Sequence, residues 1–179
     1  PEPFDRYTPR FHAPGIAGAT FQPKIDGYGK RVFAMSPFLT ASAIARAKQL
    51  GTERWELVGR EDQLAALAPS ASVGWECHLV SDDAVTGDVA DDVETQASVE
   101  VAPSPRGLHA KVLVVENFMG QVWWWLGSAN LSDAAWSGLN VELMVELRAT
   151  VTHAGIDRFL DSGIRKILVP WTASEDQRE

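Results

Sequence analysis

Three strand-length apolar runs between residues 108 and 147 limit what this chain can fold into more than any other feature. The runs are 108–115, 122–126 and 141–147, and they are rich in β-branched or aromatic side chains. Runs of this length and composition are typical of buried β-strands. Each run carries a short polar signature at one end. The sequence therefore predicts strands whose ends present polar groups.

The three signatures are His109-Ala110-Lys111, Gly127-Ser128-Ala129-Asn130 and Asn140-Val141-Glu142. Side chains alternate along a strand, so His109 and Lys111 are expected to project from one face. Ser128 and Asn130 follow the second run, in a turn where small polar groups can meet an anion. This set suits attack on a phosphodiester. His109 would attack phosphorus or donate a proton, and Lys111 would neutralise the phosphoryl oxygens, to which Ser128 and Asn130 would donate hydrogen bonds.

In this order and spacing, the signatures resemble those of the phospholipase D superfamily, the HKD phosphodiesterases. The resemblance covers residues 108–147. It implies an α/β fold with a mixed β-sheet flanked by helices, and a reaction through a phosphohistidine that needs no metal and no cofactor. It also implies that Glu142 orients a histidine through its second ring nitrogen. The catalytic residues implied are His109, Lys111, Ser128, Asn130 and Glu142.

Two features depart from the family pattern. Glu116 stands where the H-x-K-x4-D motif has aspartate. That position looks mainly structural in the family, so chemistry is expected to persist with altered local geometry. The family mechanism also uses histidines from two motif copies, whereas this chain has one. A second half would come from an identical subunit in a dimer or from another domain of a longer chain, and the start at Pro1 favours a fragment.

Composition narrows the function without fixing it. The chain has 179 residues and a formal net charge of −8. This charge counts against a broad nucleic-acid surface, although a local groove remains compatible with it. We expect a cytoplasmic nuclease acting on nucleic acid, with a phospholipase as the alternative and no membrane partner. A second alternative is a non-catalytic module that binds phosphate or nucleic acid or mediates dimerisation, and a third is that the signatures are ordinary strand-end and turn residues.

The rest of the chain predicts one domain over residues 31–171. Residues 1–30 are expected to be a linker and loops with at most one short strand, and residues 172–179 a polar tail. Alternating strands and helices predict a layered sheet with a largely parallel start. The expected strands before the motif are 31–36, 55–58, 73–80 and 96–101, and the expected helices are 37–50, 61–67 and 154–168.

Four smaller predictions concern single features. The acidic residues of 81–94 favour a solvated loop over a cation site, because their spacing does not match a calcium-binding loop. Trp123, Trp124 and Trp125 must alternate faces on a strand. Trp136 is a candidate wall on the substrate side, and Cys77, the only cysteine, is expected to be a small buried hydrophobe.

Overall fold

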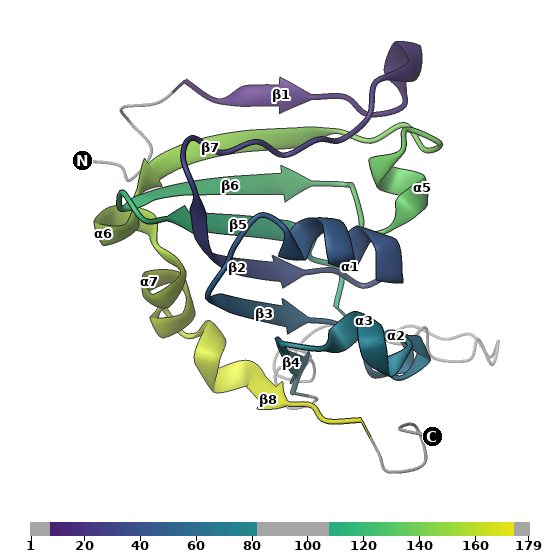
Figure 1. Ribbon diagram of the computed structural model, residues 1–179, viewed down its shortest axis with the longest axis vertical. Coiled ribbons are helices and arrows are strands. Elements are labelled where there is room, and N and C mark those ends of the chain that lie inside the picture. Colours follow the sequence, from purple (N-terminus) through teal and green to yellow (C-terminus); the bar gives the residue numbers. More distant parts are fainter. Residues whose placement is uncertain (1–7, 82–107, 174–179) are drawn as a thin grey trace, which may run out of the picture.

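A single mixed β-sheet organises the part of the chain that the computed structural model describes, residues 8–81 and 108–173. Its eight strands lie in the order β1-β7-β6-β5-β2-β3-β4-β8 (Figure 1). Their bounds are β1 Arg10–His12, β2 Gly29–Met35, β3 Arg54–Val58, β4 Trp75–Val80, β5 Val112–Asn117, β6 Gln121–Gly127, β7 Met144–Thr150 and β8 Leu168–Pro170.

The strand directions confirm the predicted parallel start. β2, β3 and β4 are parallel neighbours, and every other neighbouring pair is antiparallel. β2 lies beside β5, so the parallel half and the motif-bearing half share one sheet. The protein therefore has the α/β fold with a mixed sheet flanked by helices that the sequence indicated.

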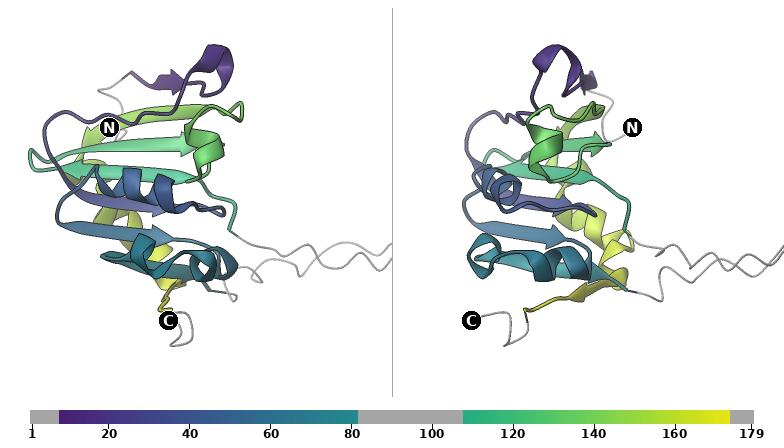
Figure 2. Two further views of the ribbon diagram at one scale, coloured as in Figure 1. Left: turned by 45° about the vertical axis from the view of Figure 1, so that its right-hand side comes forward. Right: turned by 90° about the vertical axis from the view of Figure 1, so that its right-hand side faces the viewer.

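Helices cover both faces of the sheet (Figures 1 and 2). One face is covered by α1 (Ala41–Lys48), α2 (Glu61–Ala66), α3 (Pro69–Ser72) and α5 (Asp133–Trp136). The other face is covered by α6 (Val151–Ala154), α7 (Ile156–Asp161) and the 3-10 turn η2 (Ile164–Ile167). A further 3-10 turn, η1, spans Ile16–Gly18. The single helix expected over residues 154–168 is thus a series of short segments.

The tryptophan run divides between the two cores, as alternation predicts. Trp123 and Trp125 are buried on the α1 side, and Trp124 on the α7 side. The indole of Trp124 donates a hydrogen bond to the carbonyl of Ala154 at 2.8 Å. That of Trp125 donates to Glu146 at 3.2 Å. Each of these two polar indole atoms therefore has a partner inside the core.

Trp136 does not form a wall facing solvent, so that prediction is wrong. Only 2% of it is exposed, and its ring packs edge-on against Phe21 with 5.2 Å between centroids. The guanidinium of Arg46 lies 4.9 Å from the Trp136 ring. α5 turns its apolar side toward the sheet, so the indole gains more by burial than by exposure.

Residues 8–28, expected to be linker and loops, contribute to the domain. β1 is the short strand that the prediction allowed, and it pairs with β7 as an outermost strand of the sheet. Phe21 is 1% exposed and belongs to the α1-side core. Cys77 is buried as predicted, and burial raises the pKa of its thiol to about 11. The thiol therefore stays protonated at neutral pH.

Several predictions fall on residues outside the described ranges. These are the strand over 96–101, most of the acidic loop over 81–94 and most of the polar tail over 172–179. Among the helices of the described ranges, none is long and apolar enough to cross a membrane.

Candidate active site

The three polar signatures meet at one edge of the sheet. Here "edge" means a side at which the strands begin or end, and not an outermost strand. β5 begins at Val112, β6 ends at Gly127, and β7 begins at Met144. Val112 pairs with Leu126, and Gly127 pairs with Met144. Because these neighbours are antiparallel, the start of β5, the end of β6 and the start of β7 coincide. β2, β3 and β4 also end at this edge, toward which the arrows of β2 and β3 point in Figure 1.

The strands are shorter than predicted on this side, and this corrects the expected placement of three residues. His109 and Lys111 precede β5, and Glu142 precedes β7. The ladder between β5 and β6 stops at the Val112–Leu126 pair. Residues 108–111 are not part of a ladder, so strand alternation does not govern where their side chains point.

His109 and Lys111 remain close through the backbone. His109 is exposed, and Lys111 is half-buried. The Lys111 ammonium donates a hydrogen bond to the carbonyl of His109 at 2.8 Å. This contact folds the lysine side chain back along its own segment. A positive charge is therefore held beside the backbone of the histidine.

Ser128 and Glu142 form a hydrogen-bonded pair across two loops. The Ser128 hydroxyl donates to Oε2 of Glu142 and accepts the N–H of Leu143 at 2.9 Å. The Ser128 N–H also donates to the carbonyl of Leu143 at 3.0 Å. Glu142 is only 9% exposed. The side-chain contact found for this carboxylate is with Ser128, and its role toward a histidine stays a prediction.

Asn130 carries a buried acceptor without a donor. Its side-chain Oδ1 is buried, and no hydrogen-bond partner reaches it among the described residues. An unsatisfied buried polar atom costs about 1–3 kcal/mol, so such atoms call for an explanation. A bound ligand or a neighbouring chain that supplied a donor would remove this cost. The role of Asn130 in binding stays a prediction.

The structure adds residues that the sequence did not single out. The carbonyl of Pro14 accepts the N–H of Glu142 at 2.9 Å. Gly15 has φ +84°, and a Cβ there would lie 2.2 Å from the carbonyl oxygen of Asn140. Ser36 accepts the N–H of Leu131 at 2.9 Å through its hydroxyl. The one local signal was that Ser36 follows a buried strand.

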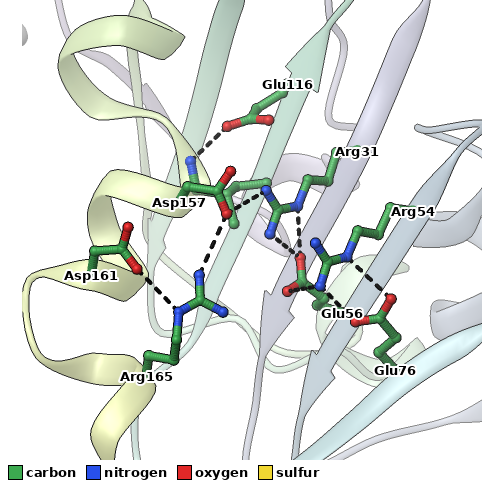
Figure 3. Close-up of polar contacts among 9 residues, drawn as sticks. Arg31, Arg54, Glu56, Glu76, Glu116, Asp157, Asp161 and Arg165 are labelled. Atoms are coloured by element: carbon green, nitrogen blue, oxygen red, sulfur yellow. Dashed lines mark hydrogen bonds and ion pairs between the residues drawn. The ribbon is translucent and has the colours of Figure 1, made fainter.

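Glu116 lies near the far end of β5, away from the signatures. Its carboxylate accepts the backbone N–H of Ile156 at 2.6 Å, at the start of α7 (Figure 3). Burial raises the pKa of the Glu116 carboxyl, while the Ile156 N–H and the nearby Arg31 act to lower it. Glu116 therefore holds a helix against the sheet, a structural role.

The face of the sheet that α7 covers also carries an ion-pair network, which connects α7 to the sheet. Arg31 places Nη1 2.8 Å from Asp157 and Nε 2.7 Å from Glu56 (Figure 3). Arg54 lies beside Arg31 in register and pairs with Glu76 at 2.7 Å. The hydrogen bond from Arg31 lowers the pKa of Asp157. These charges neutralise one another, so we assign the network to stability.

We expect Glu116→Ala to destabilise the domain by about 1–3 kcal/mol, because the N–H of Ile156 would lose its partner. Glu116→Gln keeps a carbonyl acceptor and should restore most of the loss. Since the folded-state pKa of Glu116 is raised, the native protein binds the proton more tightly than the unfolded chain. Stability of the wild type relative to Glu116→Gln should therefore fall as pH rises through the ordinary range of a glutamate.

Thermal melts of the three proteins over a pH series measure both effects. Equal melting temperatures for Glu116→Ala and Glu116→Gln at every pH would mean that the hydrogen bond from the N–H of Ile156 to Glu116 does not stabilise the domain.

No metal centre is found within residues 8–81 and 108–173. No group of three or more histidine, cysteine, aspartate or glutamate side chains there could hold an ion.

Comparison with known proteins gives structural likenesses only. No protein-family model matches the chain, and no curated protein matches it. One similar structure is "Nuc from Salmonella typhimurium", a "phospholipase D family member": identity is 15%, with 93% of this chain and 100% of that chain covered, at a TM-score of 0.48. NucT from Helicobacter pylori gives 12% identity, 92% and 99% coverage, and a TM-score of 0.48.

A mutant of yeast tyrosyl-DNA phosphodiesterase is 11% identical, with a TM-score of 0.41 over 66% of this chain. The match spans 24% of the yeast chain, about a quarter of its length. Each TM-score is below 0.5, so the activity proposed below depends on the residues of this chain. The protein is an α/β domain with a mixed sheet, similar to solved structures that include a phospholipase D family member.

Proposed function

We propose that this chain supplies one half of a metal-independent phosphodiesterase site of the phospholipase D type, acting as part of a nuclease. The observation that carries the proposal is the convergence of three signatures at one sheet edge. They come from the start of β5, the end of β6 and the start of β7. Ligands of open α/β sheets commonly bind outside the carboxyl ends of the strands, and four strands end here.

The chemistry follows from the groups present. As nucleophile, His109 forms a bond from an imidazole nitrogen to phosphorus while the bond from phosphorus to the leaving alcohol breaks. As acid, it gives its proton to that alcohol. The ammonium of Lys111 stabilises negative charge on the phosphoryl oxygens. The side-chain amide of Asn130 supplies neutral N–H donors. The Ser128 hydroxyl, which donates to Glu142 here, would turn to a phosphoryl oxygen when substrate binds.

A second acid must come from outside this half. The chain has four histidines. His12 contacts Glu146 at 3.0 Å, His78 lines a cavity on the α7 side, and His153 bonds Thr150 beside α6. Since these three have other positions in the fold, the partner imidazole would belong to a second copy or to another domain. Two His109 rings facing across a two-fold axis would satisfy this need.

We expect hydrolysis of a phosphodiester by the complete protein to persist in EDTA. The test uses bis-(p-nitrophenyl) phosphate, single- and double-stranded DNA, and phosphatidylcholine vesicles, each with EDTA or with Mg²⁺. Strict dependence on a divalent metal would rule out this mechanism. Release of choline without cleavage of DNA would replace the nuclease by a phospholipase.

Oligomeric state tests the half-site. The chain alone should be inactive where it sediments as a monomer and active only as a dimer or when joined to its other half. A monomer with full turnover would show that one motif suffices.

A non-catalytic module is the second candidate. The observation that favours it is the Lys111 ammonium, which donates a hydrogen bond to the backbone carbonyl of His109. Binding of single-stranded DNA without turnover in any oligomeric state would support this candidate against the first.

A further inference from the structure

An exposed aromatic ring lies beside the candidate site. Phe38 is 50% exposed and comes shortly after β2, at the edge where the signatures meet. Its backbone carbonyl accepts a hydrogen bond from the Ser36 hydroxyl at 2.7 Å. The same hydroxyl accepts the N–H of Leu131, the residue after Asn130, at 2.9 Å. One side chain therefore joins the Phe38 segment to the Asn130 turn.

Backbone contacts hold the two segments together. Leu39 and Leu131 form a parallel bridge, and the N–H of Thr40 donates to the carbonyl of Leu131 at 3.0 Å. Both leucines are buried. The backbone that carries the Phe38 ring is therefore fixed relative to Asn130, although the ring itself is open to solvent.

A guanidinium stands next to this ring. Arg60 follows β3 at the same edge, and its Cζ lies 5.9 Å from the centroid of Phe38. Its Nε lies 3.0 Å from Asp62, which holds the side chain in place. Gln63 further ties this corner to the Phe38 segment, since its side-chain oxygen accepts the N–H of Leu39 at 3.3 Å. An aromatic face and a cation thus form one preorganised pair.

We infer that Phe38 and Arg60 form a subsite for an unpaired base and its neighbouring phosphate, so that the substrate is a single strand of nucleic acid. This inference names a substrate class for the proposed function. It depends on that function, because the signatures at the adjacent edge are taken to cleave the bound strand. Every base offers a π-face that can stack on an aromatic side chain, whereas the bases of a duplex already stack on one another. A phosphocholine or glycerol headgroup has no planar face to stack.

The charge of the protein agrees with stacking as the main source of affinity. A net charge of −8 counts against a broad basic surface for a phosphate backbone. Arg60 already pairs with Asp62 through Nε, so its remaining N–H groups and Lys111 would neutralise only a few phosphates. Binding should therefore depend on salt more weakly than binding by a broad basic surface.

The chain offers a matched control at the opposite edge of the sheet. Phe118 is 55% exposed, and the ammonium of Lys30 lies 6.0 Å from the centroid of its ring. Phe118 lies between β5 and β6, in the connection opposite the candidate site (Figure 1). It has the same exposed ring and neighbouring cation without the neighbouring signatures.

The first experiment measures binding without turnover. A fluorescent single-stranded oligothymidylate is titrated into the complete protein carrying His109→Ala, and anisotropy is recorded. Adding Phe38→Ala should weaken binding by about tenfold, the size expected for one base stacked on an aromatic ring. Phe38→Tyr keeps the ring and should bind within about twofold of the parent, as should Phe118→Ala, which removes no base contact.

Duplex DNA and phosphatidylglycerol vesicles are the competing ligands. Duplex DNA should bind more weakly and should not respond to Phe38→Ala. Equal losses for Phe38→Ala and Phe118→Ala, no loss for either, or vesicle binding that requires Phe38 while the oligonucleotide does not bind would each overturn the subsite.

Turnover separates this inference from the proposed function. With His109 restored, Phe38→Ala should raise KM for a single-stranded oligonucleotide by about tenfold and leave kcat within twofold. Cleavage unaffected by Phe38→Ala would remove the subsite and keep the phosphodiesterase. Phe38-dependent binding with no cleavage by any form of the protein would keep the subsite and remove the phosphodiesterase.

Discussion

Replacing His109 with alanine is expected to lower phosphodiester turnover by roughly 10³-fold or more, whether the imidazole is the nucleophile or the acid. Of the other three histidines, His12 contacts Glu146, His153 contacts Thr150, and His78 lies on β4, which β2 and β3 separate from β5. His109 is exposed and precedes β5, so its loss should leave the melting temperature within about 1–2 °C of the wild type. Initial rates and thermal melts of the complete protein measure both quantities.

His153→Ala is the matched control for this variant. His153 is also exposed, and it lies on α6 beyond the end of β7, at the opposite edge from the signatures. Its removal should not change the rate. Wild-type turnover by His109→Ala would refute the assignment, and a large loss of rate in both variants would point to an indirect effect.

Lys111→Ala should cost about 3 kcal/mol of transition-state stabilisation, or roughly 10²-fold in rate. The loss should appear in kcat more than in KM, because the charge on the phosphoryl oxygens is concentrated in the transition state. The lysine also donates to the His109 carbonyl, so part of the effect can pass through that segment. Lys111→Arg retains the charge and should recover part of the rate.

Lys30→Ala provides the comparison for Lys111. Lys30 is an exposed lysine that pairs with Glu53 at 3.9 Å and lies at the start of β2, at the opposite edge. The Lys30→Ala substitution should have no effect on kcat. A loss in Lys111→Ala that appears wholly in KM would mean that this ammonium binds the ground state and the transition state equally.

The sequence could predict the elements that carry the signatures because their information is local. A buried strand needs a short apolar run, and the runs before and after Gly127 have that composition. Alternation along β6 also placed Trp124 on one core and its two neighbours on the other. The burial of Cys77 followed from its residue type, and the parallel direction of β2, β3 and β4 followed from the alternation of strands and helices along the chain.

The predictions that failed concern residues whose positions depend on partners far away in the sequence. β5 starts three residues after His109, because its ladder with β6 ends at the Val112–Leu126 pair. Trp136 is buried because Phe21, from a segment that looked like a linker, packs against it. Neither partner can be identified from the residues near His109 or Trp136 in the sequence.

By itself, the amino-acid sequence determined which residue types are available for phosphodiester chemistry and which short runs present them, because composition and side-chain period act over a few residues. Only the tertiary structure decided which groups share an edge. β2 lies between β5 and β3, and this order brings Ser36, Phe38 and Arg60 to the signatures. Strand order depends on which long-range pairings give the best burial and hydrogen bonding, and no local sequence pattern specifies it.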